Sequence, residues 1–477
     1  MKSTLKYILI ALVIKAIYFV WFGSLRSPEG FDNLNFYTIA GDARDYIEPV
    51  ENLFEGSGHQ IDGKFAARTP GYSPVYLLFR AFTSKNWAIN FTLFAQVLMS
   101  AISCYFLARF ASNLFKNPKI FPWVFWIYAF STYVSIWDIY ILTESFAAGA
   151  LIIGLYCLEK SVRTVDKKLL FISGLMMAWC FFLRPFMIPF LALIPAFVLF
   201  RFWSNKMLSL QFTLIFLSSF FVLETVWISR NYIVLNKFVP IQNLEAFDRK
   251  GSFNTSNDIS FFVGDFVRAF GGDPTIWNPK GEAFWFFNGS VENSPNIFPK
   301  NIFDDVITFD RLKSIKRDCI RIKSMKIEEK HFNNVDLKTK KELTLLFNHF
   351  KAEHPLYYQI GSRFVHLKKF LIHSGVYNIP FKSVENQSLF EKGVKATFAL
   401  LYVLVMIIGF PIIIWNWFRH FNFKSLHFIA CSIALYLIFL FPIILKTSEY
   451  RYNTLAYPLL LIFLMDFFTK SLEKLRH

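Results

Sequence analysis

The chain has 477 residues, of which 54% are hydrophobic, 19% aromatic and only 18% charged. A soluble protein carries roughly 25% charged residues and could not bury so much apolar surface, so the composition disfavours a soluble enzyme, a disordered regulator or a fibre and indicates a polytopic membrane protein. The formal net charge of +17 would suggest nucleic acid in a soluble protein. We expect no nucleic-acid partner here, because the cytoplasmic loops of membrane proteins collect Lys and Arg.

Apolar runs that approach the roughly 20 residues of a membrane span recur along the chain. The first contains Lys15, and because no small-residue cleavage site follows it, we interpret it as an uncleaved transmembrane helix. About ten spans are predicted in all, two of them short: Leu5 to Phe22, Trp87 to Phe110, Ile120 to Trp137, Ile141 to Leu158, Leu169 to Leu183, Phe186 to Trp203, Leu208 to Ile228, Ala396 to Phe418, Leu426 to Leu445 and Leu455 to Phe468. The expected fold class is an all-α polytopic membrane bundle.

Basic residues predict the orientation of these spans. When the N-terminus is placed in the cytoplasm and the sides alternate, every predicted cytoplasmic turn is basic, as the positive-inside rule requires. These turns hold Arg109 and Lys116, Lys160 to Lys168, Arg201 and Lys206, Arg419 and Lys424, and Lys470 and Lys474. Both termini are therefore predicted to be cytoplasmic.

Two long polar segments fall on the extracytoplasmic side in this topology. They divide the chain into an N-terminal transmembrane region (1–228) with a first outer loop (23–86), an extracytoplasmic loop domain of mixed structure (229–395), and a C-terminal transmembrane region (396–477). The loop domain is long enough to fold by itself.

Near the end of the loop domain, apolar residues recur at three- and four-residue spacing, at Tyr357, Ile360, Phe364, Leu367 and Leu371. This pattern predicts an amphipathic helix. Its apolar face would lie either on the membrane surface or against the core of the loop domain itself.

The first outer loop contains Asp42, Asp45 and Tyr46, which one helical turn would place on one face. A carboxylate at this position could take a proton from a hydroxyl acceptor. The alternative is that Asp42 caps a short helix, with Asp45 completing something like a capping box.

Other charged and aromatic residues mark the remaining outer turns. Arg68 and Tyr72 flank a Pro-Gly turn, where the arginine could hold a phosphate. Glu144 lies inside an apolar run and therefore needs a partner or a wet cavity. Single cations in the other turns would each be membrane-surface anchors, but a bundle would gather them all around one cavity: Arg184, Arg230, Lys446 and Arg451, with Tyr452 beside the last.

Motifs of soluble enzymes are missing from the sequence. It has no Walker loop, no GxGxxG after a strand, no GxSxG and no HExxH. No CxxC motif or His/Cys cluster predicts a structural metal site.

The ordered outer motifs resemble those of the GT-C superfamily of membrane glycosyltransferases. The nearest likeness is to the bacterial branch related to protein O-mannosyltransferases and the lipid A aminoarabinose transferase, in glycosyltransferase family 39. The likeness covers residues 1–232 and 354–477, whereas 243–353 carry no part of it. It rests on the acidic motif ending in Tyr46, Arg68-x-Pro-Gly-Tyr72, Thr143-Glu144-Ser145, Arg230-Asn231-Tyr232, His354-Pro355-Leu356-Tyr357-Tyr358 and Glu449-Tyr450-Arg451-Tyr452.

The resemblance implies an inverting glycosyltransferase. The donor would be a polyprenyl-phosphate-linked sugar, and the acceptor a lipid, glycan or protein on the outer side of a bacterial cytoplasmic (inner) membrane. Asp42 would be the catalytic base. Many relatives have a second acid directly after it, where this chain has Ala43, so that role would fall to Asp45 or Glu144.

The departing lipid phosphate needs positive charge, from arginine or from a metal. The candidates for binding the donor phosphate or the substrate are Tyr46, Arg68, Tyr72, Arg184, Arg230, Lys446, Arg451 and Tyr452. A divalent metal is a possible cofactor, and no other is expected.

Two other functions are compatible with the composition. A lipid or solute transporter or flippase would more often show paired repeats and helices broken near mid-membrane. A surface-glycan polymerase or ligase would also consume lipid-linked sugars.

Overall fold

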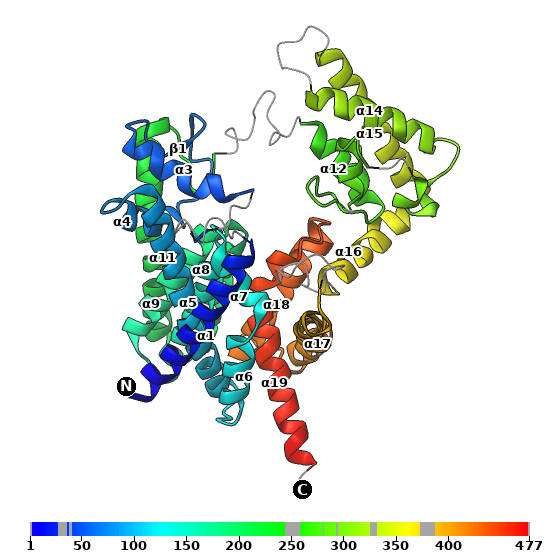
Figure 1. Ribbon diagram of the computed structural model, residues 1–477. Helices are drawn as coiled ribbons and strands as arrows, with labels where there is room; N and C mark the ends of the chain where they lie inside the picture. The colour runs from blue at the N-terminus through cyan, green and yellow to red at the C-terminus, as the bar shows by residue number, and fades with distance from the viewer. Residues whose placement is uncertain are drawn as a thin grey trace. The chain divides into compact units, whose positions relative to one another are not determined.

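The computed structural model describes residues 2–26, 36–37, 41–243, 258–279, 281–291, 294–324, 332–372 and 387–475. The chain forms two compact units, each built mainly of helices (Figure 1). The transmembrane unit comprises Met1–Asn243, Ile372–Leu437 and Tyr450–His477, and the loop unit comprises Leu244–Leu371 and Ile438–Glu449.

The first part of the transmembrane unit runs to Asn243. Its elements are α1 (Lys2–Arg26), α3 (Ala43–Phe54), β1 (Gln60–Ile61), β2 (Lys64–Phe65), α4 (Ser73–Arg80), α5 (Lys85–Leu114), α6 (Ile120–Ala129), α7 (Thr132–Ser135), η1 (Ile136–Ile139), α8 (Glu144–Thr164), α9 (Lys167–Leu183), η2 (Pro185–Met187), α10 (Phe190–Arg201) and α11 (Lys206–Leu235). The later part adds α17 (Leu389–Arg419), α18 (Leu426–Phe439), η10 (Tyr450–Thr454) and α19 (Tyr457–Lys474).

Each of the ten predicted apolar segments is helical in the structure. Among the residues that the structure describes, six helices are long and apolar enough to cross a membrane, or seven if α6 and the α7–η1 segment, which meet at 48°, form one bent span. The other three are α9 with 17 residues, the Pro185–Arg201 segment, and α19, which is interrupted by charges such as Asp466 and Lys470. These helices identify an integral membrane protein and confirm the all-α class.

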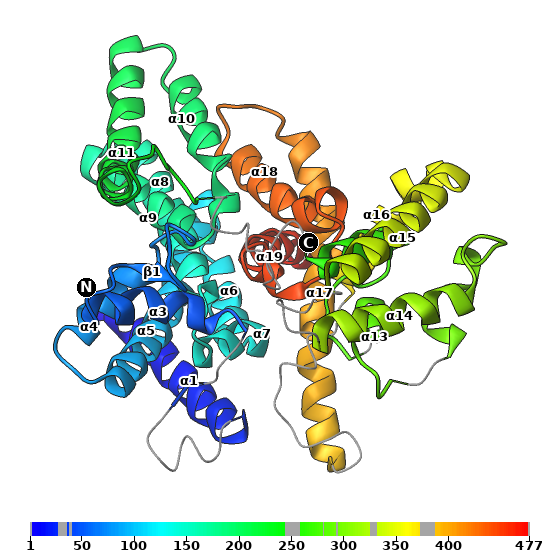
Figure 2. The ribbon, with the colours of Figure 1, turned by 90° about the horizontal axis from the view of Figure 1, so that it is seen from above.

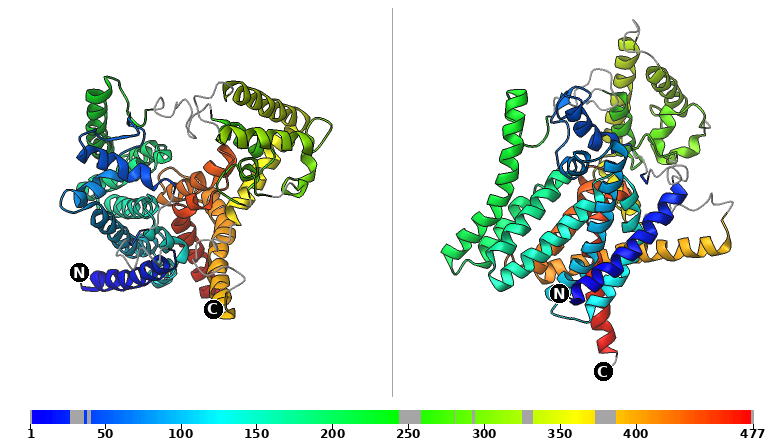
Figure 3. Two further views of the ribbon diagram at one scale, coloured as in Figure 1. Left: turned by 45° about the horizontal axis from the view of Figure 1, so that its top comes forward. Right: turned by 60° about the vertical axis from the view of Figure 1, so that its left-hand side comes forward.

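The helices of the transmembrane unit pack in a continuous series. Helix α5 lies between α1, α6 and α8, and α9 lies between α8 and α11. Figure 2 shows α10 beside α11, and Figure 3 shows α8, α9 and α11 running side by side. Helix α17 packs on α19. This packing brings the start of α8 and the end of α9 to one region.

Lys15, the charge inside the first apolar run, is fully buried in this bundle. Its Nζ donates to Ser135 Oγ at 2.9 Å and lies 5.6 Å from the ring centre of Tyr128. The buried Asp138 accepts a hydrogen bond from Ser145 Oγ at 2.6 Å. A charge in an apolar span requires such partners, and these attach α1 to the bent segment after α6.

The loop unit has its own hydrophobic core. Its elements are α12 (Ile259–Ala269), α13 (Glu282–Phe287), η4 (Pro295–Ile297), η5 (Lys300–Ile302), α14 (Phe309–Ser324), α15 (Phe332–Glu353), η6 (Tyr357–Gly361), α16 (Ser362–Leu371) and η9 (Leu440–Ile444). Phe266, Phe270, Trp285 and Phe350 lie in the core. All these elements are helical, which corrects the expected mixed structure for the described residues, because apolar residues such as Leu343, Leu346 and Phe350 recur with helical rather than strand spacing.

The apolar stripe near the end of the loop unit divides between two environments. Tyr357 packs on the core and donates to the carbonyl of Phe270 at 3.2 Å, and Leu367 and Leu371 are buried. Ile360 and Phe364 are 53% and 62% exposed. The π-helical turn η6 changes the helical register between these positions, so the stripe does not stay on one face.

Candidate active site

Asp42 lies at the N-cap position of α3, where its backbone carbonyl accepts a hydrogen bond from Asp45 N at 3.1 Å. Its side chain makes no capping hydrogen bond. Instead, the carboxylate faces two arginines: Oδ1 is 3.5 Å from Arg68 Nη2, and Oδ2 is 3.0 Å from Arg451 Nη2. The position is therefore that of a cap, but the carboxylate is engaged in ion pairs.

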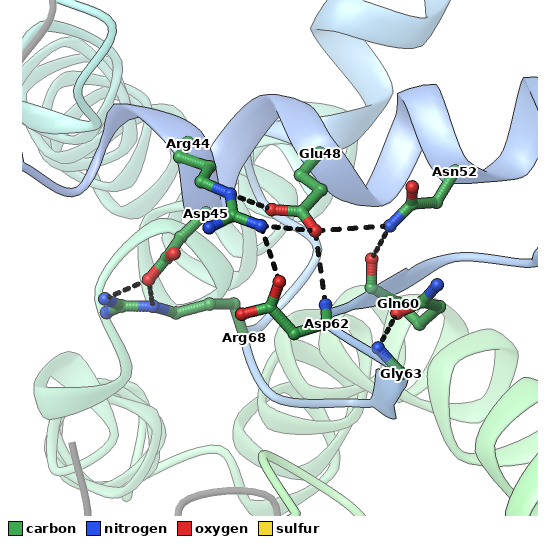
Figure 4. Close-up of polar contacts among 8 residues, drawn as sticks. All are labelled: Arg44, Asp45, Glu48, Asn52, Gln60, Asp62, Gly63 and Arg68. Atoms are coloured by element: carbon green, nitrogen blue, oxygen red, sulfur yellow. Dashed lines mark hydrogen bonds and ion pairs between the residues drawn. The ribbon is translucent and has the colours of Figure 1, made fainter. Parts of the chain in front are cut away.

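Arg68 joins Asp42 to Asp45. Its Nε and Nη2 lie 3.1 and 2.8 Å from Asp45 Oδ2, and its guanidinium is 5.9 Å from the ring centre of Tyr46. Figure 4 shows the guanidinium directed toward Asp45 at the start of α3. One cation therefore bridges the two acids that the sequence places three residues apart.

A small hairpin holds the outer face of α3. Asp62 and Gly63 connect β1 to β2 with φ values of 47° and 77°, the conformation of a two-residue turn with both residues at positive φ. Arg44 pairs with Glu48 at 2.6 Å and with Asp62 at 2.5 Å, and Glu48 also accepts from Asp62 N at 3.2 Å (Figure 4). These bonds attach the hairpin to the helix that carries Asp42.

The turn that carries Arg68 lies directly on the end of α9. Gly71 N donates to the carbonyl of Phe182 at 3.3 Å, and Trp179 Nε1 donates to the carbonyl of Gly71 at 2.9 Å. A Cβ at Gly71 would collide with the backbone of Phe182 and Leu183. Only glycine permits this approach, which brings the turn of Arg68 next to the residue that ends α9, Arg184.

Glu144 and Arg184 form a buried ion pair. Glu144 is in the first turn of α8, and Arg184 is the C-cap of α9, which packs on α8. Arg184 Nη2 contacts Glu144 Oε1, and the two side chains are 10% and 2% exposed respectively. The partner that the sequence required for Glu144 is therefore an arginine from the next helix.

Tyr452 joins this pair to the cluster of Asp42, Asp45, Arg68 and Arg451, called the Asp42 cluster below. Its ring centre is 5.6 Å from the guanidinium of Arg184 and 5.2 Å from that of Arg451. The segment η10 is fixed by Tyr133, whose hydroxyl donates to the carbonyl of Tyr450 at 2.7 Å, and by Asn453, which donates to the hydroxyl of Tyr402 at 3.1 Å. Arg451 and Tyr452 therefore project from a firmly anchored turn.

Gln96 is a supporting residue that the sequence analysis missed. It is fully buried in α5, its Oε1 accepts from the hydroxyl of Tyr72 at 2.9 Å, and its Nε2 donates to the carbonyl of Tyr140 at 2.9 Å. Tyr72 in turn packs on Tyr46, with ring centres 5.3 Å apart. An uncharged amide in an apolar span was the available signal, because such a group needs internal partners.

The charges of this cluster balance. Three carboxylates, of Asp42, Asp45 and Glu144, face three guanidinium groups. Burial by itself raises the pKa of Asp42, but Arg451, Arg68 and Arg184 outweigh burial and hold that pKa below its usual value. Asp42 is therefore ionised at neutral pH and, at 31% side-chain exposure, accessible to a substrate.

Arg230 belongs to a separate group of contacts. Its guanidinium donates to the carbonyl of His59 and to Asn231 Oδ1, and lies 5.2 Å from the ring of Trp227. Burial, followed by the charge of Arg230, lowers the pKa of His59 to about 4. Arg230 thus connects the end of α11 to the segment before the hairpin.

Lys446 belongs to the loop unit. Its Nζ donates to the carbonyl of Tyr358 at 2.9 Å and lies 3.5 Å from the centre of that ring. Burial, reinforced by Arg363 and Lys351, lowers the pKa of Lys446 to about 8. Its predicted phosphate contact stays a prediction.

The acids of the cluster do not fit a divalent metal. Among the described residues, no group of three or more His, Cys, Asp or Glu side chains is arranged to hold an ion. Arg68 already occupies the position between Asp42 and Asp45 that a shared cation would take. The positive charges of the described cluster are those of Arg68, Arg184 and Arg451.

No family model and no curated protein matches the sequence. Among solved structures, the chain is similar to the archaeal oligosaccharyltransferase AglB from Archaeoglobus fulgidus, in complex with an inhibitory peptide and a dolichol-phosphate. The TM-score is 0.47 at 11% identity, and the match covers 99% of this chain and 51% of the other. The chain thus spans about half the length of that structure.

Proposed function

We propose that this chain is an inverting glycosyltransferase that moves a sugar from a polyprenyl-phosphate donor to an acceptor on the extracytoplasmic face of the membrane. The observation that carries the proposal is the environment of the Asp42 side chain. Asp42 stands at the N-cap position of α3, but its carboxylate makes no capping hydrogen bond; it is partly exposed and is held by Arg68 and Arg451. The ordered GT-C-like motifs of the sequence supply the donor class, and Asp42 stands at that family's base position.

The chemistry requires one base and one anion-binding group. The hydroxyl group of the acceptor gives its proton to Asp42 as the hydroxyl oxygen attacks the anomeric carbon of the sugar. The bond from that carbon to the phosphate oxygen breaks. The phosphate leaves with the bonding electrons as polyprenyl phosphate. No strong general acid is needed, because this leaving group is already stable as an anion.

Arg184 and Arg451 are suited to bind the phosphate. Both lie against Tyr452, and both influence the pKa of Asp42 through their charge. Guanidinium groups in a partly buried site bind phosphate in paired hydrogen bonds and stabilise the charge that develops on it. Tyr46, packed on Tyr72 beside Arg68, would border the sugar.

Asp45 has a supporting role in this proposal. Arg68 holds it through two hydrogen bonds, so it fixes the guanidinium that orients Asp42. Glu144 fixes Arg184 in the same way. The second acid of the site thus acts by positioning an arginine and does not take a proton from the acceptor.

A donor panel tests this proposal. Purified full-length protein would be incubated with polyprenyl-phosphate sugars and with glycan, lipid and peptide acceptors, and free polyprenyl phosphate would be measured, with and without a chelator. Release that depends on an acceptor and persists with the chelator supports the proposal. Absence of release with every donor, together with solute or lipid flux in liposomes, would favour a transporter instead.

A further inference from the structure

A cavity lies away from Asp42 and its arginine partners, between α17, α19 and the start of α6. Its volume is about 1050 Å³, and its walls include Ile412, Trp415 and Arg419 from α17 and Phe467, Lys470 and Lys474 from α19. This volume exceeds what a single phosphate needs and is close to the upper end, about 1,000 Å³, of the pockets that bind drug-sized ligands.

The cavity carries an excess of positive charge. Lys470 pairs with the buried Asp466 at 2.7 Å, and Lys119 pairs with Glu473 at 2.9 Å. Within each pair, the positive and the negative charge neutralise each other. Arg419 and Lys474 also line the cavity, and neither forms an ion pair with any residue that the structure describes. Two cations therefore remain to attract an anion.

Both helices that line the cavity carry apolar and basic residues on it. On α17, Ile412, Trp415 and Arg419 are spaced by three and four residues and share a face, with Trp415 68% exposed. On α19, Phe467 is 50% exposed and is followed by Lys474 seven residues later. Each of the two helices thus contributes an apolar aromatic side chain and a cation to the lining of the cavity.

We propose that this cavity binds an anionic phospholipid of the surrounding membrane. Its phosphate would lie between Arg419 and Lys474, and the upper part of an acyl chain would lie against Trp415 and Phe467. Basic pockets between transmembrane helices are suited to such headgroups. A soluble phosphate would use the cations alone and leave the exposed Trp415 without a partner. The proposal is independent of the function assigned to Asp42.

Native mass spectrometry of the purified full-length protein tests the site. The protein in detergent would be titrated with phosphatidylglycerol, with phosphatidylcholine, and with inorganic phosphate. We expect one phosphatidylglycerol to be retained in preference to phosphatidylcholine. The double variant Arg419→Gln/Lys474→Gln should weaken this binding about 30-fold, because two basic contacts are removed.

The control is Arg201→Gln/Lys206→Gln, which removes two exposed cations from the ends of α10 and α11. This control should bind phosphatidylglycerol normally, and both double variants should unfold at the temperature of the unmodified protein when lipid is absent. Trp415→Ala should weaken binding of the lipid without changing that of inorganic phosphate. The proposal is overturned if the two double variants bind alike, if both lipids bind equally, or if inorganic phosphate displaces the lipid at equal concentration.

Discussion

Arg451 Nη2 lies 3.0 Å from Asp42 Oδ2, although 409 positions of sequence separate the two residues. The contact joins the short helix after α1 to the segment between α18 and α19. Because the same arginine lies against Tyr452, which also contacts Arg184, the two ends of the chain complete one site.

Replacing Arg451 by lysine tests this contact. Lysine retains the charge but loses the planar fork that can face Asp42 and a phosphate together. We expect kcat/KM for the lipid donor to fall roughly 10- to 100-fold, the value of one to two charged hydrogen bonds. Arg201→Lys, at an exposed helix end, should have no effect. Full activity of the lysine variant would mean that Arg451 contributes only its charge to the structure.

Variants of the Glu144–Arg184 pair should distinguish its contribution to stability from its contribution to catalysis. Glu144→Gln leaves a buried guanidinium without its counter-charge, and should lower the free energy of unfolding by about 3–5 kcal/mol. The double variant Glu144→Gln/Arg184→Gln should regain most of that stability, measured by thermal unfolding in detergent. It should remain inactive, since Arg184 is needed for the phosphate. Recovery of both stability and turnover would show that the pair is only structural.

The acidic limb of the pH profile should report Asp42. Its pKa in the folded protein lies below its usual value, so activity should be level at neutral pH and fall only as the pH drops through that lowered pKa. The stability contributed by the ion pairs follows the same sign: it is present above the unfolded pKa of about 4 and is lost as the pH falls through the folded value.

Arg451→Gln should move the acidic limb of the pH profile to higher pH. The substitution removes the charge that lowers the pKa of Asp42 most, while burial, which raises that pKa, remains. The measurement is kcat/KM against pH for the two proteins. An unchanged limb would mean that a different group controls the pH dependence.

Gly71→Ala tests the close approach of the Arg68 turn to α9. The added Cβ meets the backbone of Phe182 and Leu183, which cannot move as a side chain can. We expect a loss of about 1–3 kcal/mol in stability, with lower activity. Gly393→Ala is the matched control, because nothing lies within 4 Å of a Cβ there and a helix favours alanine. Equal stability of the two variants would contradict the packing argument.

The sequence was sufficient to locate the helices and several members of the cluster. Apolar runs predict spans because a bilayer fixes their length, and a charge such as Glu144 within one predicts a buried partner. The identity of that partner, Arg184, depends on how α8 and α9 pack, which the periodicity of either helix alone does not specify.

The sequence could not assign each outer cation to its group. Arg230 and Arg451 have the same appearance in the chain, next to aromatic residues at the end of a span, yet Arg230 binds the carbonyl of His59 and Arg451 binds Asp42. Gln96 was missed because its function depends on the hydroxyl of Tyr72, which reaches it only in the folded bundle.

Asp42→Asn provides the most direct test of the central claim. Asparagine keeps the shape of the side chain and caps helices about as well as aspartate, but it cannot take a proton from the acceptor. The variant should fold, bind the donor lipid and lose transfer by roughly 10²–10⁴-fold, the usual contribution of a general base. Asp45→Asn is the comparison and should lose less. Near-normal transfer of the sugar by Asp42→Asn would contradict the account.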